Sequence, residues 1–335
     1  MTGRWRCTGA RTAGLALGFA ADLAFGDPRR GHPVAGFGRL AAALERRLWA
    51  DSRRRGVAYA ALCVGATAGA GLLARRLTAH HPVAETLVTA AATWAVLGGR
   101  SLAAEGRAMH RLLDHGDLDG ARRRLSHLAG RDPAELGPGE LARATVESLA
   151  ENTSDAVVAP LLWGAVAGVP GLVGYRAANT LDAMVGHRRA RYARFGWGAA
   201  RLDDLANLLP ARVSAALAAA AAPLVGGTPG AARRAWRRDA ARHPSPNAGP
   251  VEAAFAGALG VTLGGANRYG DRVEDRGRLG DGPAPMVADI PRAVRLSRLV
   301  GAGGLAVAAV LAQAVSRGPV TGPRRPESPR PECAG

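Results

Sequence analysis

Residues 53–99 read RRRGVAYAALCVGATAGAGLLARRLTAHHPVAETLVTAAATWAVLGG, and this stretch decides the fold class. Two apolar runs, 57–73 and 83–99, follow an arginine cluster and a His-His-Pro turn. Each run approaches the roughly 17–25 apolar residues that a helix needs to cross the hydrocarbon core of a bilayer. Small residues fill both runs, as is typical of closely packed membrane helices. The stretch therefore predicts two membrane-spanning helices.

Four further apolar runs extend this pattern along the chain: 12–25, 157–175, 213–225 and 299–315. The last qualifies as a spanning helix almost as well as the first two. The other three are short or interrupted, so buried core helices or re-entrant segments are the alternatives for them. No alternating strand pattern persists anywhere. We expect an all-α fold, a polytopic integral membrane helical bundle with amphipathic and re-entrant helices and roughly four to six inserted segments.

The two ends of the chain and the polar stretches between the runs complete this organisation. Residues 1–315 are expected to form a single membrane-embedded domain that begins with an uncleaved anchor or an amphipathic entry helix. Residues 316–335 are rich in proline without apolar periodicity, which predicts a disordered tail. Leucines at helical spacing predict amphipathic helix over 101–145, and loops are expected at 242–250, around the glycines at 264–270, and at 267–291.

Composition removes several functional classes. The chain of 335 residues has 44 basic residues, all arginine, against 27 acidic ones, for a net charge of +17. A nucleic-acid partner would suit this charge, but the arginines cluster beside the apolar runs, where the positive-inside rule places them. The 3 cysteines are scattered, which excludes a disulfide scaffold and CxxC zinc sites. Without lysine there is no Walker A motif.

Polar residues that could bind a ligand or take part in a reaction lie between 147 and 212. They form three clusters, and each cluster adjoins an apolar segment. Glu147, Glu151 and Asp155 are spaced to share one helical face, where like charges repel unless a cation lies between them. Asn179 and Asp182 form the second cluster. The third cluster runs from Arg201 through Asp203, Asp204 and Asn207 to Arg212.

These side chains suit magnesium and phosphate, because Mg²⁺ prefers oxygen ligands and is commonly held by one or two carboxylates plus substrate phosphates. The alternative is that they are ordinary surface ion pairs at helix ends. The expected metal ligands are Glu151, Asp155, Asp182, Asp203 and Asp204. The acids expected to be catalytic are Glu147, Glu151, Asp155, Asp182 and Asp204. The residues expected to bind substrate or phosphate are Asp27, His32, Asn152, Asn179, Arg201, Asn207, Arg212, Ser245, Asn247 and Glu252.

Two expectations concern geometry. Strict alternation of spans would place 175–212 outside the cell, away from ATP, so we expect 157–175, which is broken at Pro170-Gly171, to turn back without spanning. The proline-stiffened loop around Ser245 and Asn247 is expected to approach the acids, although both are also common helix-capping residues.

The sequence resembles the adenosylcobinamide-phosphate synthase family of cobalamin biosynthesis (the CobD/CbiB family). The resemblance is carried by ESLAENTSD (147–155), YRAANTLD (175–182), FGW (195–197), RLDDLAN (201–207) with PAR (210–212), GDP (26–28), HPV (32–34), HPSPN (243–247), Glu252 and the glycines 264 and 265. It extends from about residue 12 to 315, and each motif alone is weak whereas the set is specific. His187 departs from the pattern, which has an aromatic residue there.

The resemblance implies a multi-pass enzyme of the bacterial inner membrane. It would join adenosylcobyric acid to aminopropanol phosphate, or aminopropanol, in an ATP-dependent amide-forming step with Mg²⁺. Its further implied partners are membrane lipid and other enzymes of the corrinoid pathway, and no nucleic acid is expected. Two other readings of the same residues remain open. One is a membrane prenyltransferase-like enzyme that holds magnesium diphosphate on Asn179, Asp182, Asp203, Asp204 and Asn207. The other is a non-catalytic membrane scaffold for corrinoid enzymes.

Overall fold

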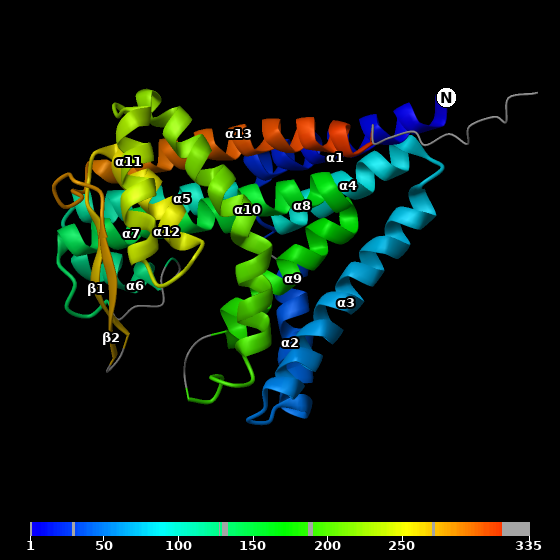
Figure 1. Ribbon diagram of the computed structural model, residues 1–335, viewed down its shortest axis with the longest axis horizontal. Helices are drawn as coiled ribbons and strands as arrows, with labels where there is room; N and C mark the ends of the chain where they lie inside the picture. The colour runs from blue at the N-terminus through cyan, green and yellow to red at the C-terminus, as the bar shows by residue number, and fades with distance from the viewer. Residues whose placement is uncertain are drawn as a thin grey trace, which may run out of the picture.

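The computed structural model describes residues 2–28, 31–126, 128, 133–186, 190–269 and 272–316. Within them the chain is almost entirely helical, as the sequence predicted (Figure 1). The N-terminal half contains α1 (Thr2–Phe25), α2 (Pro33–Leu48), α3 (Arg53–Thr78), α4 (Pro82–Val96), α5 (Gly99–Asp114), α6 (Leu118–Leu125) and α7 (Pro138–Thr153). One turn of π-helix, η1 (Ser154–Val158), joins α7 to α8 (Ala159–Ala167).

The C-terminal half begins with α9 (Val169–Val185), α10 (Trp197–Ala221) and the short η2 (Ala222–Val225). It continues with α11 (Pro229–Asp239), η3 (Ala240–Arg242), α12 (Ala248–Leu259), β1 (Leu263–Tyr269), β2 (Arg272–Leu279) and α13 (Asp289–Ser316). Apart from Ser316, the proline-rich tail expected at 316–335 lies outside the described residues.

Four helical stretches of the described chain are long and apolar enough to cross a membrane: Arg53–Thr78, Pro82–Asp114, Trp197–Val225 and Asp289–Val315. They include both runs of the opening motif and the run at 299–315, and the borderline run at 213–225 is the end of a longer apolar helix. Large aliphatic side chains such as Leu73, Leu77 and Val310 face outward from these helices. Surface of this kind is suited to contact with lipid.

Close helix approach in the apolar part depends on small residues. Figure 1 shows α1, α4 and α13 running side by side, and α1 packs along both of the others. A Cβ at Gly14 would lie 2.5 Å from the Cβ of Thr89, and one at Gly18 would overlap Thr93. The spacing of these two glycines therefore lets α1 and α4 touch backbone to backbone, as in small-xxx-small packing.

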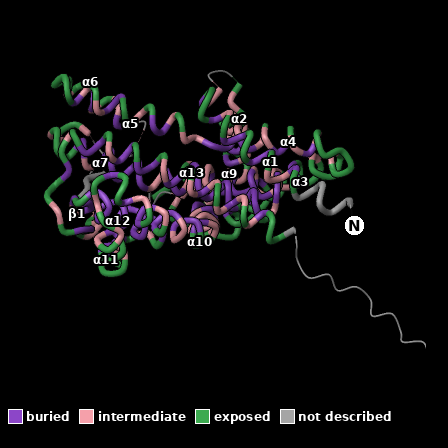
Figure 2. The backbone as a smooth tube through the Cα atoms, turned by 90° about the horizontal axis from the view of Figure 1, so that it is seen from above, coloured by how far each residue is buried: buried purple, intermediate pink, exposed green. Residues whose placement is uncertain are grey.

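The less apolar elements of the protein, α5, α6, α11 and the β-hairpin, surround two central helices, α7 and α12. Figure 2 shows buried positions running along α7 and α12, and all 12 residues of α12 are buried. Helices α5, α6 and α11 and the β-hairpin lie around them in Figure 1. The amphipathic stretch expected at 101–145 is not one helix: a turn with Gly116 at φ 73° separates α5 from α6.

The antiparallel hairpin β1–β2 occupies a region where the sequence predicted loops, and this part of the prediction was wrong. Its pairing is interrupted by a bulge between Gly264 and Ala266. Gly264 and Gly265 both have φ of 82°, a conformation that glycine adopts without strain. The bulge breaks the alternation of apolar and polar residues from which a strand is normally recognised in a sequence.

Candidate functional site

Acidic side chains from separate parts of the sequence meet in one cavity of about 90 Å³, which we call the acidic cavity. It is lined by Glu151, Ser154, Asp155, Asp182, Asp203, Asp204, Asn207, Ser245, Asn247, Ala248 and Val251. These residues come from α7 with η1, from α9, from α10 and from the segment that begins α12. All five of the expected metal ligands are among them.

A short helical hairpin brings α9 back to the acids of α7. Helix α8 has only 9 residues, about 14 Å of helix, which is half of what a bilayer core requires. Gly168, at φ 70°, ends it, and α9 then returns along it. The Tyr175 hydroxyl lies 3.0 Å from the backbone oxygen of Asp155 and 2.9 Å from Asn207 Oδ1. The hairpin thus returns α9 to the level of η1, the course expected for 157–175.

Helix α10 presents its polar residues to α9 through specific contacts. Asn179 Nδ2 donates to Asp203 Oδ1 at 3.3 Å, and Asn207 Nδ2 donates to the backbone oxygen of Asp203 at 3.2 Å. Arg201 forms an ion pair with Asp204 at 3.1 Å, one turn along the helix. The third sequence cluster is therefore held against the second, with both of its acids lining the cavity.

The loop at 243–247 closes the cavity from the α12 side. Asn247 Nδ2 donates to the backbone oxygen of Asp204 at 2.7 Å, and its Oδ1 accepts from Arg212 at 3.0 Å. The Ser245 hydroxyl accepts from the backbone N–H of Asn247 at 3.3 Å and of Ala248 at 3.2 Å. Ser245 therefore caps the start of α12 and also lines the cavity, so both roles considered from the sequence are present.

Burial and mutual repulsion govern the charge state of the acids. Burial, with the charges of Asp203, Glu151 and Asp182, raises the pKa of Asp155 well above its ordinary value. Burial, with the charges of Asp204 and Glu151, raises the pKa of Asp182 to about 6. A cation in the cavity would relieve both effects.

The donor set fits a hard cation whose coordination is completed by a substrate. Carboxylate, amide and hydroxyl oxygens line the cavity, and the buried Ser154 hydroxyl has no hydrogen-bond partner among the described residues. Within that part of the chain no three His, Cys, Asp or Glu side chains are grouped closely enough to form a metal site by themselves. Mg²⁺ commonly takes only one or two protein carboxylates and fills its shell with phosphate oxygens and water.

Comparison with known proteins identifies the family. A family model described as CobD/Cbib protein matches residues 15–297. The chain belongs to the CobD/CbiB family. A cobalamin biosynthesis protein CobD of Mycobacterium tuberculosis is 56% identical over 302 residues, covering 90% of this chain and 96% of that protein. Proteins of the same name from Geobacter metallireducens and Chromobacterium violaceum are 48% and 44% identical, over 80% and 84% of this chain and 86% and 90% of theirs.

These matches place the chain in cobalamin biosynthesis, as its motifs predicted. No solved structure matches it at a significant level. The geometry of the acidic cavity is therefore read from this chain alone.

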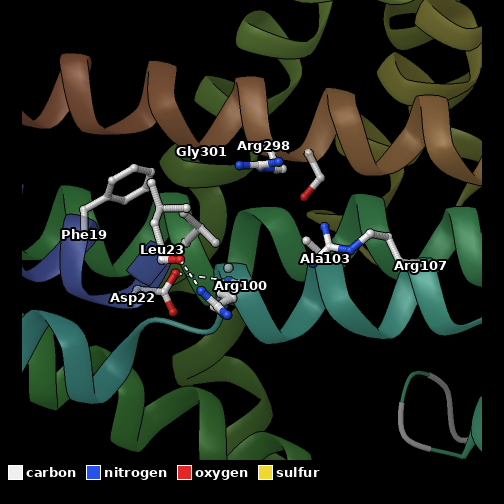
Figure 3. Close-up of a pocket in the computed structure, with 11 residues that line it drawn as sticks. Phe19, Asp22, Leu23, Arg100, Ala103, Arg107, Arg298 and Gly301 are labelled. Atoms are coloured by element: carbon white, nitrogen blue, oxygen red, sulfur yellow. Dashed lines mark hydrogen bonds between the residues drawn. The ribbon is translucent and has the colours of Figure 1, made fainter. Parts of the chain in front are cut away.

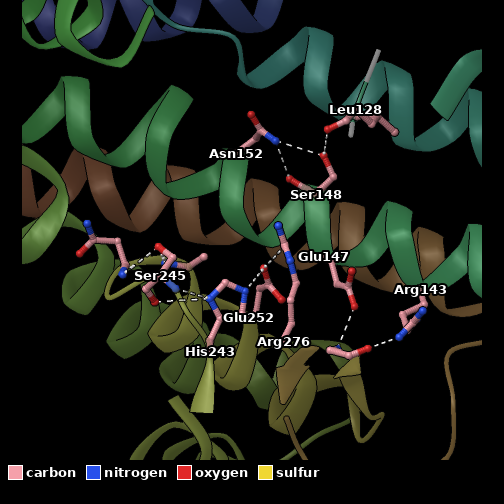
Figure 4. Close-up of polar contacts among 12 residues, drawn as sticks. Leu128, Arg143, Glu147, Ser148, Asn152, His243, Ser245, Glu252 and Arg276 are labelled. Atoms are coloured by element: carbon pink, nitrogen blue, oxygen red, sulfur yellow. Dashed lines mark hydrogen bonds and ion pairs between the residues drawn. The ribbon is translucent and has the colours of Figure 1, made fainter. Parts of the chain in front are cut away.

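Two acids of the CobD/CbiB motifs lie outside the cavity, contrary to expectation (Figure 4). Glu147 Oε1 accepts from the backbone N–H of Gly264 at 2.8 Å, because two helical turns separate it from Asp155 and carry it to the start of β1. Glu252 is fully buried, 3.6 Å from His243 Nε2 and 3.5 Å from Arg276 Nη1. Both carboxylates hold the hairpin and the 243–247 loop onto the helices.

Three expected substrate-binding residues are also placed elsewhere. Asn152 Nδ2 donates to the backbone oxygen of Ser148 at 2.9 Å, on the side of α7 that faces away from Ser245 in Figure 4. His32 caps α2 by accepting from the backbone N–H of Val34 at 3.1 Å. Asp27 lies near the end of α1. His187, where the family pattern is broken, lies outside the described residues.

Sequence reasoning missed the roles of Ser154 and Tyr175. Both lie inside quoted motifs, but neither has a charge that would single it out. Ser154 lines the cavity directly, and Tyr175 joins η1 to α10. Their position beside the acids in the sequence could have indicated these roles, because a hydroxyl buried next to the acids needs a hydrogen-bond partner or a ligand.

Proposed function

We propose that this protein forms the amide bond between a propionate carboxylate of adenosylcobyric acid and aminopropanol phosphate, or aminopropanol, using ATP and Mg²⁺ at the acidic cavity. One observation carries the proposal: five carboxylates, separated by up to 53 positions in sequence (151 to 204), converge on one small cavity in a chain of the CobD/CbiB family. Oxygen donors of this kind suit Mg²⁺ and phosphate.

The chemistry requires activation, because a carboxylate is a poor electrophile. A carboxylate oxygen of the corrinoid attacks the γ-phosphorus of ATP, the bond from that phosphorus to the bridging oxygen breaks, and ADP leaves. The amine nitrogen then attacks the acyl carbon of the acyl phosphate, loses a proton and expels inorganic phosphate. Bound Mg²⁺ supplies charge neutralisation on the phosphate oxygens, and phosphoryl transfer depends mainly on such positioning and neutralisation.

The chain's own residues would divide this work. Glu151, Asp155, Asp203 and Asp204 are the candidate metal ligands. Asp182, the remaining carboxylate of the cavity, is the candidate to accept the proton of the attacking amine.

The remaining polar residues around the cavity would bind substrate. Arg201 is exposed beside Asp204, so its guanidinium can exchange that ion pair for a phosphate. Arg212, Asn179, Asn207, Ser245 and Asn247 are the further candidates for contacts with substrate. Asn247 would also link cavity and loop, since it bridges Asp204 and Arg212.

The same proposal places the enzyme in the bacterial inner membrane with several spans and the acidic cavity on the cytoplasmic side, where ATP is available. The re-entrant course of α8 and α9 supports a common side for Asp155 and Asp182. Single cysteines at 179 and 204 should resist a membrane-impermeant thiol reagent applied from the periplasm. Labelling from that side would reject the assigned orientation.

The deciding experiment incubates purified protein with ATP, Mg²⁺, adenosylcobyric acid and each amine donor, and measures ADP and the amide product. Equal amounts of both are expected, and Asp204→Asn should lose most of the turnover. Asp114→Asn, which changes an exposed acid at the end of α5, serves as the matched control. Prenyl transfer without ATP, or absence of any turnover, would support the prenyltransferase-like or the scaffold reading instead.

A further inference from the structure

A second and larger cavity, of about 300 Å³, lies between α1, α5 and α13 (Figure 3). We call it the arginine groove, and it is lined by Phe19, Asp22, Leu23, Gly99, Arg100, Ala103, Arg107, Val157, Ser297, Arg298 and Gly301. The groove is separate from the acidic cavity, because Val157 of η1 lines the groove whereas Ser154 and Asp155 of the same turn line the cavity. None of its residues was expected to be functional from the sequence.

The groove lies at the level where three apolar runs of the sequence end. Its lining residues mark the end of each run: Asp22 for 12–25, Gly99 for 83–99 and Arg298 for 299–315. The ends of apolar runs lie where the hydrocarbon of a bilayer gives way to headgroups, and flanking arginines are common there. Leu23, which is 41% exposed, extends the apolar wall of the groove to the outer surface of α1. The groove is therefore placed for a lipid.

Positive charge in the groove lacks a counter-ion. Arg107 and Arg298 lie close enough to repel each other, and neither makes a hydrogen bond or ion pair with the described part of the chain. Arg100 differs, because its guanidinium donates to the backbone oxygens of Leu23 and Ala24 at 2.7 and 2.6 Å and so caps α1. Two guanidinium groups therefore remain available for an anion, and their planar donor geometry suits a phosphate.

One buried carboxylate also lines the groove. Asp22 is 1% exposed, and its Oδ2 accepts from the backbone N–H of Arg100 at 3.1 Å. Its Oδ1 is buried without a hydrogen-bond partner among the described residues, and such an oxygen requires a donor. Figure 3 shows Asp22 apart from Arg107 and Arg298 along the groove. Because the arginines of the groove outnumber this acid, the donor that fits best is a neutral hydroxyl carried by an anion.

We propose that the arginine groove binds an anionic phospholipid, with its phosphodiester on Arg107 and Arg298 and a hydroxyl of its headgroup donating to Asp22 Oδ1. Phosphatidylglycerol has this chemistry, since its phosphate carries the negative charge and its headgroup ends in free hydroxyls. Basic pockets between membrane helices recognise anionic headgroups in this way. The inference concerns a lipid site and does not depend on the reaction proposed for the acidic cavity.

A bound headgroup would hold α5 and α13 together beside the π-helical turn. Arg107 belongs to α5 and Arg298 to α13, and the Thr153 hydroxyl donates to Ser297 Oγ at 2.6 Å, which ties α13 to the end of α7. A ligand that binds only the folded protein stabilises it. Bound phosphatidylglycerol should therefore raise the Tm.

Native mass spectrometry of the full-length protein in neutral detergent, titrated with dioctanoyl lipids, tests this site. The probes are phosphatidylglycerol, phosphatidylmethanol, which has the same charge but no free hydroxyl, and phosphatidylcholine, which is neutral overall. Phosphatidylglycerol should bind roughly tenfold more tightly than phosphatidylcholine and several-fold more tightly than phosphatidylmethanol. Soluble glycerol phosphate should not compete at equal concentration, because it lacks the acyl chains that contact the apolar wall.

Three variants assign the contacts. R107Q/R298Q should weaken the binding of phosphatidylglycerol by roughly tenfold or more, because charge-assisted hydrogen bonds to phosphate are lost. Asp22→Asn should bind phosphatidylglycerol and phosphatidylmethanol equally, since the amide can keep the bond from the backbone of Arg100 but leaves no carboxylate oxygen for the hydroxyl. Arg295→Gln, an exposed arginine one turn away on α13, should match the wild type.

Thermal unfolding separates loss of the site from loss of the fold. Both arginines of R107Q/R298Q are exposed, so this variant should unfold at the wild-type temperature without lipid and gain nothing from phosphatidylglycerol. The proposal is overturned if R107Q/R298Q binds this lipid as the wild type does, if phosphatidylcholine binds equally well, or if glycerol phosphate binds as tightly as the lipid, which would assign the groove to a dissolved phosphate.

The role of Asp22 has its own test. A preference for phosphatidylglycerol over phosphatidylmethanol that persists in Asp22→Asn would overturn it. If that variant does not fold, equal binding of the two lipids by the wild type would overturn it instead. Amide-forming turnover is measured separately, and its absence would reject the proposed reaction while leaving the lipid-binding results as they stand.

Discussion

Replacing Asp182 by asparagine should stabilise the metal-free protein while removing its activity. The pKa of Asp182 is raised from its ordinary 3.8 to about 6, chiefly by burial and then by the charges of Asp204 and Glu151. At about 1.4 kcal/mol per pKa unit this corresponds to about 3 kcal/mol against the ionised form in the folded state. Partial solvent exposure of Asp182 reduces the effect, so a gain of about 1–3 kcal/mol is expected above pH 6.

The sign of the pH dependence follows from the raised pKa. Below about pH 4 the carboxyl group is protonated in both folded and unfolded chains and imposes no penalty. As the pH rises through 6 the folded wild type must ionise Asp182 and loses stability, whereas Asp182→Asn does not. The difference in apparent Tm should therefore be largest at pH 7.5 and should narrow as the pH approaches 4.

Thermal unfolding in detergent, with and without Mg²⁺, measures this difference. If the proposed magnesium site exists, Mg²⁺ should raise the Tm of the wild type more than that of Asp182→Asn, because the variant lacks one of the carboxylates that line the cavity. Asp114→Asn should match the wild type under every condition. A lower Tm for metal-free Asp182→Asn at pH 7.5 would show that the carboxylate is already compensated within the fold, and would refute the argument from repulsion.

Three further predictions concern single side chains near the cavity. Gly186→Ala should keep the fold but reduce turnover several-fold, because a Cβ at this position would overlap Oδ1 of Asp182. Values of kcat and KM equal to those of the wild type would contradict this. Burial lowers the pKa of His243 to about 4, so the unfolded chain takes up a proton before the folded one does as the pH falls from 6.5 towards 4. The wild type should therefore lose stability over that range, and His243→Gln should show a flatter profile of Tm against pH. Tyr175→Phe should lower stability by about 1–2 kcal/mol by removing the hydroxyl contact with Asn207, and unchanged denaturant midpoints would argue against that contact.

Sequence patterns located most of the acidic cavity because its acids share a local signature. Asp155, Asp182 and Asp203 each lie in a polar cluster next to an apolar run, and such boundaries occur at similar depth in a helical bundle. The candidate spans were predicted from run length, and the turn that precedes α9 was predicted from the break at Pro170. These features depend on neighbours in the chain, which a single sequence displays directly.

What the sequence could not supply were contacts between distant elements. Glu147 has the spacing of a third acid on the same helical face, but the backbone of Gly264, 117 positions later, takes its carboxylate. A second cavity, which Arg107 and Arg298 line together with Val157 of the π-helical turn, is similar, since these two arginines are far apart in the sequence. The π-helical turn that divides the two pockets leaves no recognisable pattern, because the same residues also favour ordinary α-helix.

The brevity of α8 has a consequence for how the protein is made. A helix of 9 residues cannot anchor itself across a bilayer while the ribosome is still adding chain. Its neighbours include α1 and α9, made before and just after it, and α13, the last helix that the structure describes. The turn that presents Asp155 therefore gains its complete packing only after α13 has been synthesised. A truncated product that lacks α13 would carry every acidic residue of the cavity but not the helix against which η1 and α8 pack.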